Sequence, residues 1–320
     1  MKLFEFDKYF PNEESCKMKF KEIREQQGIV CKKCGCKYHY WLTNKQQFRC
    51  KQCKTSITLR SGTVMHGSKL PFRYWFIAMH LLTATKHTFS ATEIKSQLNH
   101  KRYQSIWEMV HKLRSIMGKR EQEYLLKGQV EVDEGFFTTE IPENEKYNKL
   151  KAGAGSQRKA KVLVMAESSK VTKEEKSNKK YKKEKKVGYI KMSVIEDLKS
   201  TTIDSEVINS IDSKAEIMSD ATKSHSNFKN IFNKVESQVI KPEEIGKLLP
   251  WVHIAIGNSK SLFRDTYHGI KREYLQEYLN EFCYKFNRRY FGEGLFDRLM
   301  EISVMYQSDF EHKMYNRNIA

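Results

Sequence analysis

The hydrophobic positions of this chain follow a helical period in one region and a strand period in another. Before residue 120, apolar side chains recur every three or four positions, as at Ile106, Val110, Leu113 and Met117, and this spacing predicts amphipathic helices. From Gln129 the pattern changes to short runs rich in β-branched residues, which predict strands. These runs are QVEVDEGFF, KAKVLVMAES, VGYIKMSVIED and KAEIMSD.

The predicted strands are too continuously apolar for a ribbon with one face in water, so a partly buried sheet is expected. Between the second and third lies a lysine-rich stretch, residues 170–186, with nine Lys against three Glu. Such a charge run predicts a solvated hairpin loop or insertion, and contact with a DNA backbone is the alternative. From Ser224 onward the pattern predicts mostly helix, ending in YLQEYLNEFCYKFNRRYFGEG.

The predicted helices carry capping signals. Asn12 or Ser15 can cap a first helix, and Pro71 suits the first turn of another. Ser90 followed by Glu93 makes a capping box, and a longer basic helix comes after it. A short helix, a turn and a basic helix form the pattern of a helix-turn-helix module. A helical bundle that bridges two domains fits the same pattern equally well.

The net charge indicates the class of partner. The 320 residues include 58 Lys and Arg against 39 Asp and Glu, a formal net charge of +19. This excess predicts attraction to a polyanion, because each phosphate neutralised by a cation releases counterions. Nucleic acid is the leading partner class and a membrane surface is the rival. No run of about 18 apolar residues occurs, so a bilayer-spanning helix is not expected.

Four cysteines, Cys31, Cys34, Cys50 and Cys53, form two C-x2-C pairs separated by fifteen residues. Each pair aims two thiolates at one point, and the hairpin predicted between HYWLT and QQFRC closes a tetrahedral Zn²⁺ site. Two disulfides or metal-free thiols are the alternative. The N-terminal sequence lacks the apolar core of a secretory signal, so we expect a reducing compartment, which favours metal. Cys36 could compete as a ligand.

Two acidic residues stand at the ends of predicted strands. Asp133 directly precedes Glu134, and Asp220 closes EIMSD before a helix-like segment. Carboxylates at the ends of adjacent strands can bind Mg²⁺ or Mn²⁺, and such ions can activate a water or a 3′-hydroxyl against a phosphodiester. An acid at a strand end is more often a turn or cap residue, so this pattern alone does not establish a site.

A more specific set of motifs lies near the C-terminus, in LPWVHIAIGNSKSLFRDTYHGIKREYLQEYLNEFCYKFNRRY. PWVH, the Asn-x-Lys of GNSK, TYHG and YLNEFCYKFNRR resemble the transposase domain of bacterial insertion sequences of the ISXO type, relatives of the eukaryotic Merlin elements. GTVMHGSKLPFRYWF resembles the linker of that family, and VEVDEGFF resembles its first catalytic strand. The resemblance spans roughly residues 15–292 and leaves out the lysine-rich stretch.

The resemblance implies a DDE-type domain that binds transposon ends, nicks them and joins the 3′-hydroxyl to target DNA with Mg²⁺ or Mn²⁺. By position, Asp133 and Asp220 would be the first two metal-binding carboxylates. Many DDE enzymes have a Glu on a helix as the third residue, with a Lys downstream. The matching stretch here offers His253 and Asn258, with Lys260 as the basic partner. Family members can carry Asn at the third position, which favours Asn258; possible substitutes are Glu134, Asp265 and Glu273.

Several residues near these motifs are candidates for DNA contact. Lys260 and Arg264 can bind backbone phosphate. Arg288 and Arg289, at the end of the last predicted helix, either reach phosphate or pair with acids. In TYHG, the aromatic residues either position DNA or pack inside the domain; these are Tyr267 and His268.

Two further patterns are expected to be structural. The stripe on the last predicted helix is expected in the core; it consists of Tyr278, Phe282 and Phe286. His225 follows Asp220 closely, but a lone histidine without partners is not expected to be a ligand.

We therefore expect a multidomain α+β chain. Residues 1–64 would form an N-terminal helix and a zinc ribbon, and residues 65–124 a helical, helix-turn-helix-like DNA-binding module. Residues 125–300 would form a ribonuclease-H-like α/β domain with a mixed sheet, followed by a tail, 301–320. The ribbon would either grip the transposon end or only shape the N-terminal region.

The expected function is a DNA transposase that binds terminal inverted repeats and carries out metal-dependent cleavage and strand transfer. It would work as a homo-oligomer on double-stranded DNA, at the nucleoid of a bacterium or in the nucleus of a eukaryote. The missing third carboxylate raises an alternative, a catalytically degenerate zinc-ribbon DNA-binding protein derived from a transposase. A stand-alone nuclease of the same fold would cut without joining.

Overall fold

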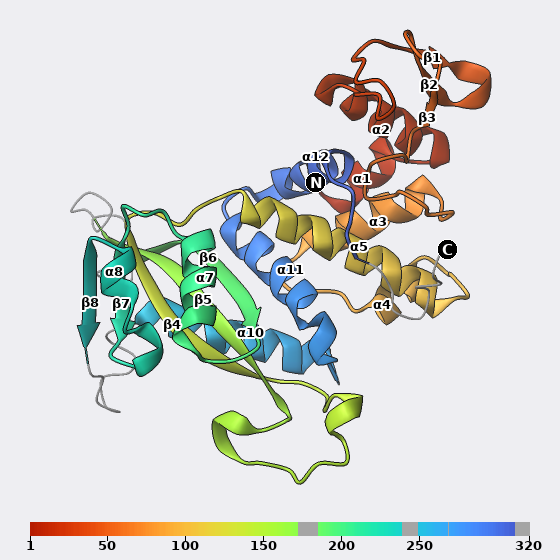
Figure 1. Cartoon of the computed structure of the whole chain (residues 1–320). Coiled ribbons are helices and arrows are strands. Elements are labelled where there is room, and N and C mark those ends of the chain that lie inside the picture. The colour runs from red at the N-terminus through yellow and green to blue at the C-terminus, as the bar shows by residue number, and fades with distance from the viewer. Residues whose placement is uncertain (172–184, 239–248, 268, 311–320) are drawn as a thin grey trace. The chain divides into compact units, whose positions relative to one another are not determined.

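The computed structural model describes residues 1–171, 185–238, 249–267 and 269–310 (Figure 1). The chain divides into two compact units. The first contains residues 1–119 and the described residues from 288 onward, and the second contains residues 120–287. The division falls inside helix α5 (Tyr103–Gln122), so this helix contributes to both units. In the part of the chain that is described, no helix is long and apolar enough to cross a membrane.

The ribbon of the first unit is a three-stranded antiparallel sheet of β1 (His39–Leu42), β2 (Gln47–Cys50) and β3 (Ser56–Thr58). The first two strands form the hairpin that the sequence predicts. Their connection is the 3-10 turn Thr43–Lys45 followed by Gln46, whose φ of 47° lies in the left-handed region. The hairpin brings the second cysteine pair back toward the first.

Helix α2 (Glu13–Gln27) joins the ribbon to the rest of the first unit. Asn12 caps it by accepting a hydrogen bond from the backbone N–H of Ser15, which confirms the predicted helix start. Near the other end of the helix, the guanidinium of Arg24 is buried and donates to carbonyl groups at the end of the ribbon, among them that of Ser61 at 2.6 Å. A buried cation shared among several carbonyls fixes the ribbon to the helix.

The other helices of the first unit pack around an aromatic cluster. Phe6, Phe10, Phe76 and Phe296 are buried, with ring centroids between 5.0 and 6.4 Å apart. Phe296 lies on the last helix, so this helix belongs with the N-terminal ones and runs through the expected boundary at residue 300. The rings come from α1 (Leu3–Tyr9) and the residue after it, α3 (Phe72–Ala84) and α12 (Leu295–Met305). Helix α4 (Ala91–Gln97) follows α3 along the chain.

Helix α4 begins with the predicted capping box. Its N-cap Ser90 accepts from the N–H of Glu93, and the carboxylate of Glu93 accepts from the N–H of Ser90 at 2.7 Å. Helices α4 and α5 are the short and the long helix of the expected module, and its role in reading DNA stays a prediction.

The second unit is built on a five-stranded mixed sheet with the order β6-β5-β4-β7-β8. The first three strands along the chain, β4 (Gln129–Thr138), β5 (Lys159–Lys170) and β6 (Lys185–Ile195), pair antiparallel. The next two, β7 (Glu216–Asp220) and β8 (Lys234–Gln238), run parallel to β4. Numbered along the chain, the order is 3-2-1-4-5, which is the ribonuclease-H-like arrangement that we expected.

Helices cover both faces of this sheet (Figure 1). Alternating residues such as Val130 and Val132 pack with α7 (Ser200–Ser210) and α8 (Phe228–Ile231) on one face. On the other face the sheet packs against α10 (Pro250–Thr266) and α11 (Leu275–Asn287), where the predicted aromatic stripe of α11 joins the core. Burial of both faces explains the continuously apolar strands.

Two expectations about this unit need comment. The expectation of mostly helix after Ser224 is wrong at β8, which is a short, charged edge strand with a weak apolar signal. The lysine-rich stretch connects β5 to β6, but its residues 172–184 lie outside the described residues.

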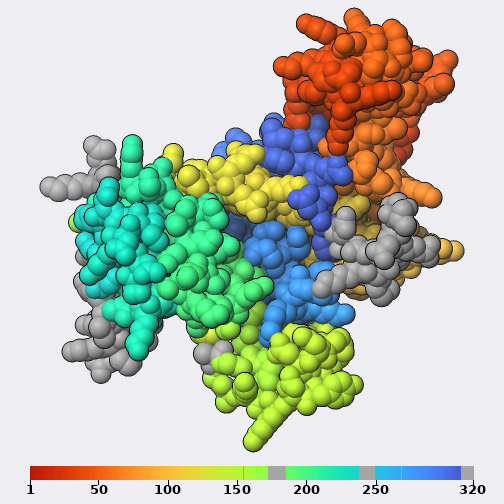
Figure 2. Space-filling model, in the orientation of Figure 1, coloured from red at the N-terminus to blue at the C-terminus, as the bar shows by residue number. Residues whose placement is uncertain are grey.

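Residues 139–158 connect β4 to β5 and project from the surface of the second unit (lime green in Figure 2). Arg272 fixes the base of this projection. Its guanidinium donates to the carbonyl of Gln157 at 2.5 Å and pairs with the carboxylate of Glu145 at 3.4 Å.

Candidate active site

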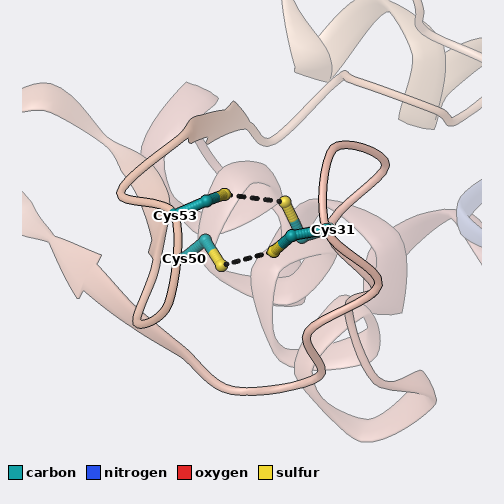
Figure 3. Close-up of side chains that lie close together, drawn as sticks. Cys31, Cys50 and Cys53 are labelled. Atoms are coloured by element: carbon teal, nitrogen blue, oxygen red, sulfur yellow. Dashed lines mark hydrogen bonds between the residues drawn. The ribbon is translucent and has the colours of Figure 1, made fainter.

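The four paired cysteines converge in the first unit (Figure 3). The Sγ atoms of Cys31 and Cys53 are 3.5 Å apart, those of Cys34 and Cys50 are 3.6 Å apart, and all four lie within 4.8 Å of one another. Four sulfurs at 2.3 Å from a tetrahedral Zn²⁺ would be about 3.8 Å apart. The cluster therefore has the size of a zinc site.

Backbone turns hold both cysteine pairs in place. The N–H of Gly35 donates to the carbonyl of Cys31 at 2.8 Å, and the N–H of Lys54 donates to that of Cys50 at 3.2 Å. Gly35 and Lys54 both have positive φ, which closes each turn. Hydrogen bonding by Thr55 lowers the pKa of Cys53 to about 6, so this thiol ionises easily.

Cys36 lies outside the four-sulfur group. Its Sγ contacts the backbone of Tyr38, with the N–H of Tyr38 at 3.4 Å. The described geometry therefore gives Cys36 no place as a competing ligand.

The two strand-end aspartates lie on neighbouring strands of the second unit. β4 and β7 are parallel, with Val132 opposite Ser219. The next residues along the two strands are Asp133 and Asp220. Because neighbouring strands lie about 4.8 Å apart, this register brings the two carboxylates to the same point of the sheet.

The charges of these two aspartates influence each other. Burial of its carboxyl group raises the pKa of Asp133 to about 6, and the negative charge of Asp220 acts in the same direction. A hydrogen bond from the N–H of Glu134 to Oδ1 of Asp133, at 2.7 Å, opposes this shift. A pair of coupled carboxylates, one of them largely desolvated, is an arrangement that favours a bound cation.

Helix α10 brings His253 to this pair. The Nδ1 atom of His253 lies 3.8 Å from Oδ2 of Asp133. The start of the helix is fixed by the fully buried Glu131, whose carboxylate accepts from the N–H groups of Trp251 at 2.8 Å and Val252 at 3.2 Å. Glu131 and Asp133 point to the same face of β4, so one strand anchors the helix and carries the catalytic candidate.

Gly135 allows α10 to lie close to β4. A Cβ atom at this position would be 3.3 Å from the side chain of Ile256 and 3.1 Å from the ring of Phe137. The glycine in VDEGFF thus has a packing reason, since a side chain there would force the side chains of Ile256 and Phe137 to shift by a few tenths of an ångström.

Asn258 and Lys260 sit on different sides of α10. At 100° per residue, Asn258 is turned about 140° from His253, whereas Lys260 is turned only about 20°. Asn258 and Lys260 are both exposed, and the Nζ of Lys260 lies 5.5 Å from the ring centroid of Phe137. Partial burial, with the positive charge of Lys159 adding to it, lowers the pKa of Lys260. The structure thus places His253 near Asp133, and Lys260, unlike Asn258, lies on the His253 face of α10.

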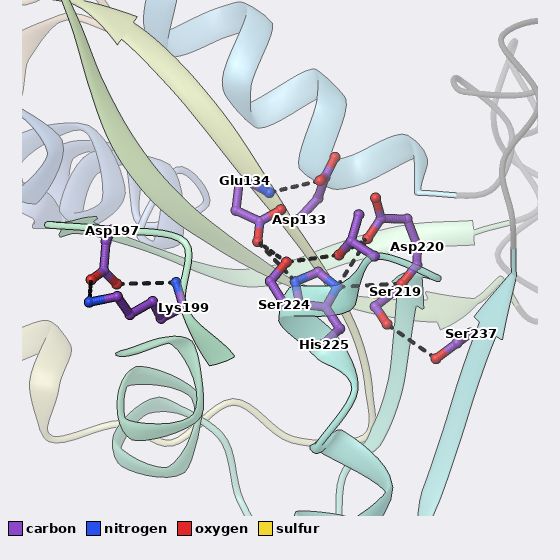
Figure 4. A network of polar contacts seen from close by, with 10 residues as sticks. Asp133, Glu134, Asp197, Lys199, Ser219, Asp220, Ser224, His225 and Ser237 are labelled. Carbon is purple, nitrogen blue, oxygen red and sulfur yellow. Dashed lines mark hydrogen bonds and ion pairs between the residues drawn. The ribbon is translucent and has the colours of Figure 1, made fainter. Parts of the chain in front are cut away.

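A second histidine joins two carboxylates beside this pair (Figure 4). His225 is buried, with Nδ1 3.0 Å from Oδ1 of Asp220 and Nε2 3.1 Å from Oε1 of Glu134. Its ring stacks on Phe228 at 4.7 Å between centroids. Glu134, Asp220 and His225 form a compact group of potential metal-binding atoms.

His225 and Asp220 shift each other's pKa toward the charged forms. Burial of the ring disfavours its charged form, but its contacts with the carboxylates of Asp220 and Glu134 outweigh burial and raise the pKa of His225 to about 9. For Asp220, burial is likewise outweighed by the hydrogen bond and charge of His225, and its pKa is lowered. An imidazolium therefore lies between two carboxylates.

The remaining candidates lie elsewhere. Arg264 pairs with Asp265 at 3.7 Å, and both are exposed on α10. Glu273 lies in a 3-10 turn before α11. Arg288 is only 8% exposed, which limits its access to phosphate, and Arg289 stacks on Tyr290.

Two residues of the C-terminal motifs have packing contacts. Asn287 is buried; its side-chain Oδ1 accepts from the N–H of Ile190 at 2.8 Å, and its Nδ2 donates to the carbonyl of Ile190 at 2.9 Å. Tyr267 packs its ring against Tyr278 at 4.5 Å, which supports a packing role. His268 lies outside the described residues.

Three residues contribute more to the site than their sequence context indicates. His225 looks like a lone histidine in the sequence because Glu134, one of its two partners, is far away along the chain. Glu131 and Glu134 stand in an apolar strand, VEVDE, and a charged residue at a position predicted to be buried is a signal that could have found them.

Comparison with known proteins agrees with this arrangement. Residues 125–287 match the family model described as the ISXO2-like transposase domain, and residues 11–56 match the transposase zinc-ribbon domain. No curated protein matches the chain. Among solved structures, a pre-cleavage Mos1 transpososome is similar, with 11% identity over 77% of this chain and 82% of that chain. Its TM-score of 0.25 is too low to support a conclusion.

The ISXO2-like match covers more than half of the chain and contains both aspartates, His253 and Lys260. The zinc-ribbon match covers the four cysteines. The order of the two matches is the one that the sequence motifs predict. The chain belongs to the ISXO2-like family of DDE transposases.

Proposed function

We propose that this chain is a DNA transposase that binds the terminal inverted repeats of an insertion sequence and catalyses metal-dependent strand cleavage and strand transfer. The observation that carries the proposal is the meeting of Asp133 and Asp220 on parallel neighbouring strands. His253 and Lys260 on α10 complete one side of this site.

Asp133, Asp220 and His253 would hold a divalent cation. The donor set fits, since carboxylate oxygens suit Mg²⁺ and Mn²⁺, and an imidazole nitrogen suits Mn²⁺ better than Mg²⁺. When bound, such an ion supplies Lewis acidity toward a phosphodiester. Near neutral pH, Asp133 is mostly ionised because its pKa is about 6, so it is available as a ligand.

Lys260 would bind a phosphate next to the scissile bond. It shares its helix face with His253, two turns away, and its ammonium group lies beside the ring of Phe137 while the side chain stays exposed. An exposed ammonium group is accessible to a phosphate oxygen and binds it as a point charge. This role orients the DNA strand relative to the carboxylates.

Double-stranded DNA is the proposed partner, both as transposon end and as target, and the protein would act as a homo-oligomer on it. The net charge of +19 supports this class of partner. In the ribbon, Cys31, Cys34, Cys50 and Cys53 would bind a structural Zn²⁺. The ribbon and the α4–α5 pair would then contact the end DNA.

One observation favours a second candidate function. The candidates for the third position, His253 and Asn258, carry no negative charge, whereas many DDE enzymes have a carboxylate there. A degenerate transposase that binds DNA without cutting it would also have this feature. The intact aspartate pair and the charged group around His225 favour the active enzyme.

An end-cleavage assay separates these functions. The purified protein, kept in its zinc-loaded form, is incubated with Mn²⁺ or Mg²⁺ and a duplex that carries the element's inverted repeat beside flanking DNA. A transposase nicks at the repeat boundary and joins the new 3′-hydroxyl to a second duplex. Binding without nicking would indicate the degenerate protein, and nicking without joining would indicate a nuclease.

A further inference from the structure

The turn that follows β7 contacts the carboxylates of Asp220 and Glu134, which lie at the two nitrogens of the His225 ring. The hydroxyl of Thr222 donates to Oδ1 of Asp220 at 3.0 Å, and Nδ1 of His225 lies 3.0 Å from the same oxygen. The hydroxyl of Ser224 donates to Oε1 of Glu134 at 3.2 Å, and Nε2 of His225 lies 3.1 Å from that oxygen. The two hydroxyl groups are themselves 2.9 Å apart. Each carboxylate thus has one oxygen that contacts both a hydroxyl group and a nitrogen of the His225 ring.

The chemistry of the partners explains why a histidine fits here. An ionised carboxylate only accepts hydrogen bonds, and imidazole donates from both nitrogens only as the imidazolium. The ring is buried and stacked on Phe228, which leaves it little freedom to turn. His225 therefore joins Asp220 and Glu134 as a rigid bridge.

The His225 bridge lies on the side of β4 that carries Glu134, and the neighbouring Asp133 points to the other side. Asp133 and Glu134 are adjacent in sequence and point to opposite faces of β4. Asp133 lies on the α10 side near His253, whereas Glu134 lies on the side of His225 and Phe228. Without its contacts to Ser224 and His225, the Glu134 side chain could turn toward the aspartate pair and add a third carboxylate there.

We propose that His225 is a positioning residue for the transposase reaction. It holds Oδ1 of Asp220 so that Oδ2 remains for the cation, and it keeps Glu134 out of the set of ligands. The inference rests on the proposed function, because it assigns the ligand role to Asp133 and Asp220. It differs from a site in which Glu134, Asp220 and His225 bind a metal together, which the same three residues could also form.

The test uses the full-length, zinc-loaded protein and two readouts, cleavage of end DNA and binding of Mn²⁺ followed by electron paramagnetic resonance. His225→Ala is expected to lower the rate of cleavage at saturating DNA by about a hundredfold, because a misplaced ligand is costly. DNA affinity and the number of bound Mn²⁺ ions should stay unchanged. Loss of Mn²⁺ in parallel with activity would make His225 a ligand and overturn the proposal, as would unchanged cleavage.

A second substitution gives a readout that a general packing defect would not produce. Glu134→Gln keeps an acceptor for Ser224 and His225 and should change cleavage by less than about threefold. The double variant His225→Ala, Glu134→Gln should cleave at least about tenfold faster than His225→Ala alone, because the glutamine has no negative charge that could enter the metal site. No restoration, or inactivity of Glu134→Gln alone, contradicts the proposed role of the bridge.

Asn227→Ala is the matched control. Asn227 follows in the same turn but donates to Asp204, at 2.8 Å, away from the carboxylates. It should leave both readouts unchanged. If His225→Ala does not fold, the Glu134→Gln result still decides whether Glu134 is a ligand. If the wild-type protein does not cleave, the proposed function fails, and Mn²⁺ binding by the same variants still tests the bridge.

Discussion

His253 and Asp133 face each other across the space between α10 and β4, with Nδ1 of the histidine 3.8 Å from Oδ2 of the aspartate. The two residues come from opposite ends of the matched transposase domain. Their approach depends on Gly135, which lets α10 lie near the strand, and on Glu131, which fixes the start of the helix. We therefore propose His253, in place of Asn258, as the third residue of the site.

The first prediction distinguishes His253 from Asn258. His253→Ala should reduce Mn²⁺-dependent cleavage by about a hundredfold, whereas Asn258→Ala should stay within about threefold of the wild type, because Asn258 is turned away from Asp133. His253→Glu should move the metal preference from Mn²⁺ toward Mg²⁺, since it adds an oxygen ligand with charge. Rates measured in each metal check this, and a larger loss for Asn258→Ala would reverse the assignment.

The second prediction concerns pH and the stability of the protein without added divalent cation. Asp133 has its pKa raised from 3.8 to about 6 on folding, so the folded state binds this proton more tightly than the unfolded state. Its contribution to stability is complete below about pH 3.8 and is lost as pH rises through about 6. Asp133→Asn should therefore be more stable than wild type at pH 7.5, by on the order of 2 kcal/mol, and equal to it near pH 4.

Calorimetry at both pH values checks this difference. Added Mn²⁺ should stabilise the wild type and leave Asp133→Asn nearly unchanged, because only the wild type has the full ligand set. A wild type that is more stable than the variant at pH 7.5 without divalent cation would show that Asp133 is not a desolvated carboxylate.

The third prediction concerns the ribbon. Cys50→Ser should lose the bound zinc, lower the thermal stability of the first unit and weaken binding to end DNA, because the metal holds both cysteine turns. Cys36→Ser is the matched control, since its sulfur lies outside the four-sulfur group. Metal analysis should give one zinc per chain for wild type and for the control. Zinc retained by Cys50→Ser but lost from Cys36→Ser would mean that the ligands are misassigned.

The fourth prediction compares two basic residues of α10. Lys260→Ala should lower the cleavage rate more than the affinity for DNA, because Lys260 shares the His253 face and acts at the reacting phosphate. Arg264→Ala should change affinity only slightly, since Arg264 is exposed and pairs with Asp265. Rates and affinities at two salt concentrations separate these effects. Equal losses for both variants would remove the special role of Lys260.

Much of this architecture could be predicted from local sequence signals. The spacing of Cys31, Cys34, Cys50 and Cys53, the caps at Asn12 and Ser90, and the apolar strands all report on neighbouring residues, and the structure has the corresponding ribbon, helices and sheet. Strand β8 was missed because an edge strand exposes one side and needs few apolar residues.

The site itself was harder to predict, because its contacts join distant segments. The preference for Asn258 came from the family pattern, and only the packing of α10 places His253 on the side of Asp133. His225 looked solitary because its partner Glu134 lies on another strand, far away in sequence. A histidine's role depends on what the fold brings to both of its nitrogens.

The most direct test of the central claim is end cleavage in Mn²⁺ by wild type, Asp133→Asn and Asp220→Asn at equal DNA occupancy. The wild type should nick at the repeat boundary and transfer the strand. Each variant should bind the same DNA and lose cleavage by at least about a thousandfold, because each removes one of two shared carboxylate ligands. Cleavage at the wild-type rate by either variant would contradict the assignment of the active site.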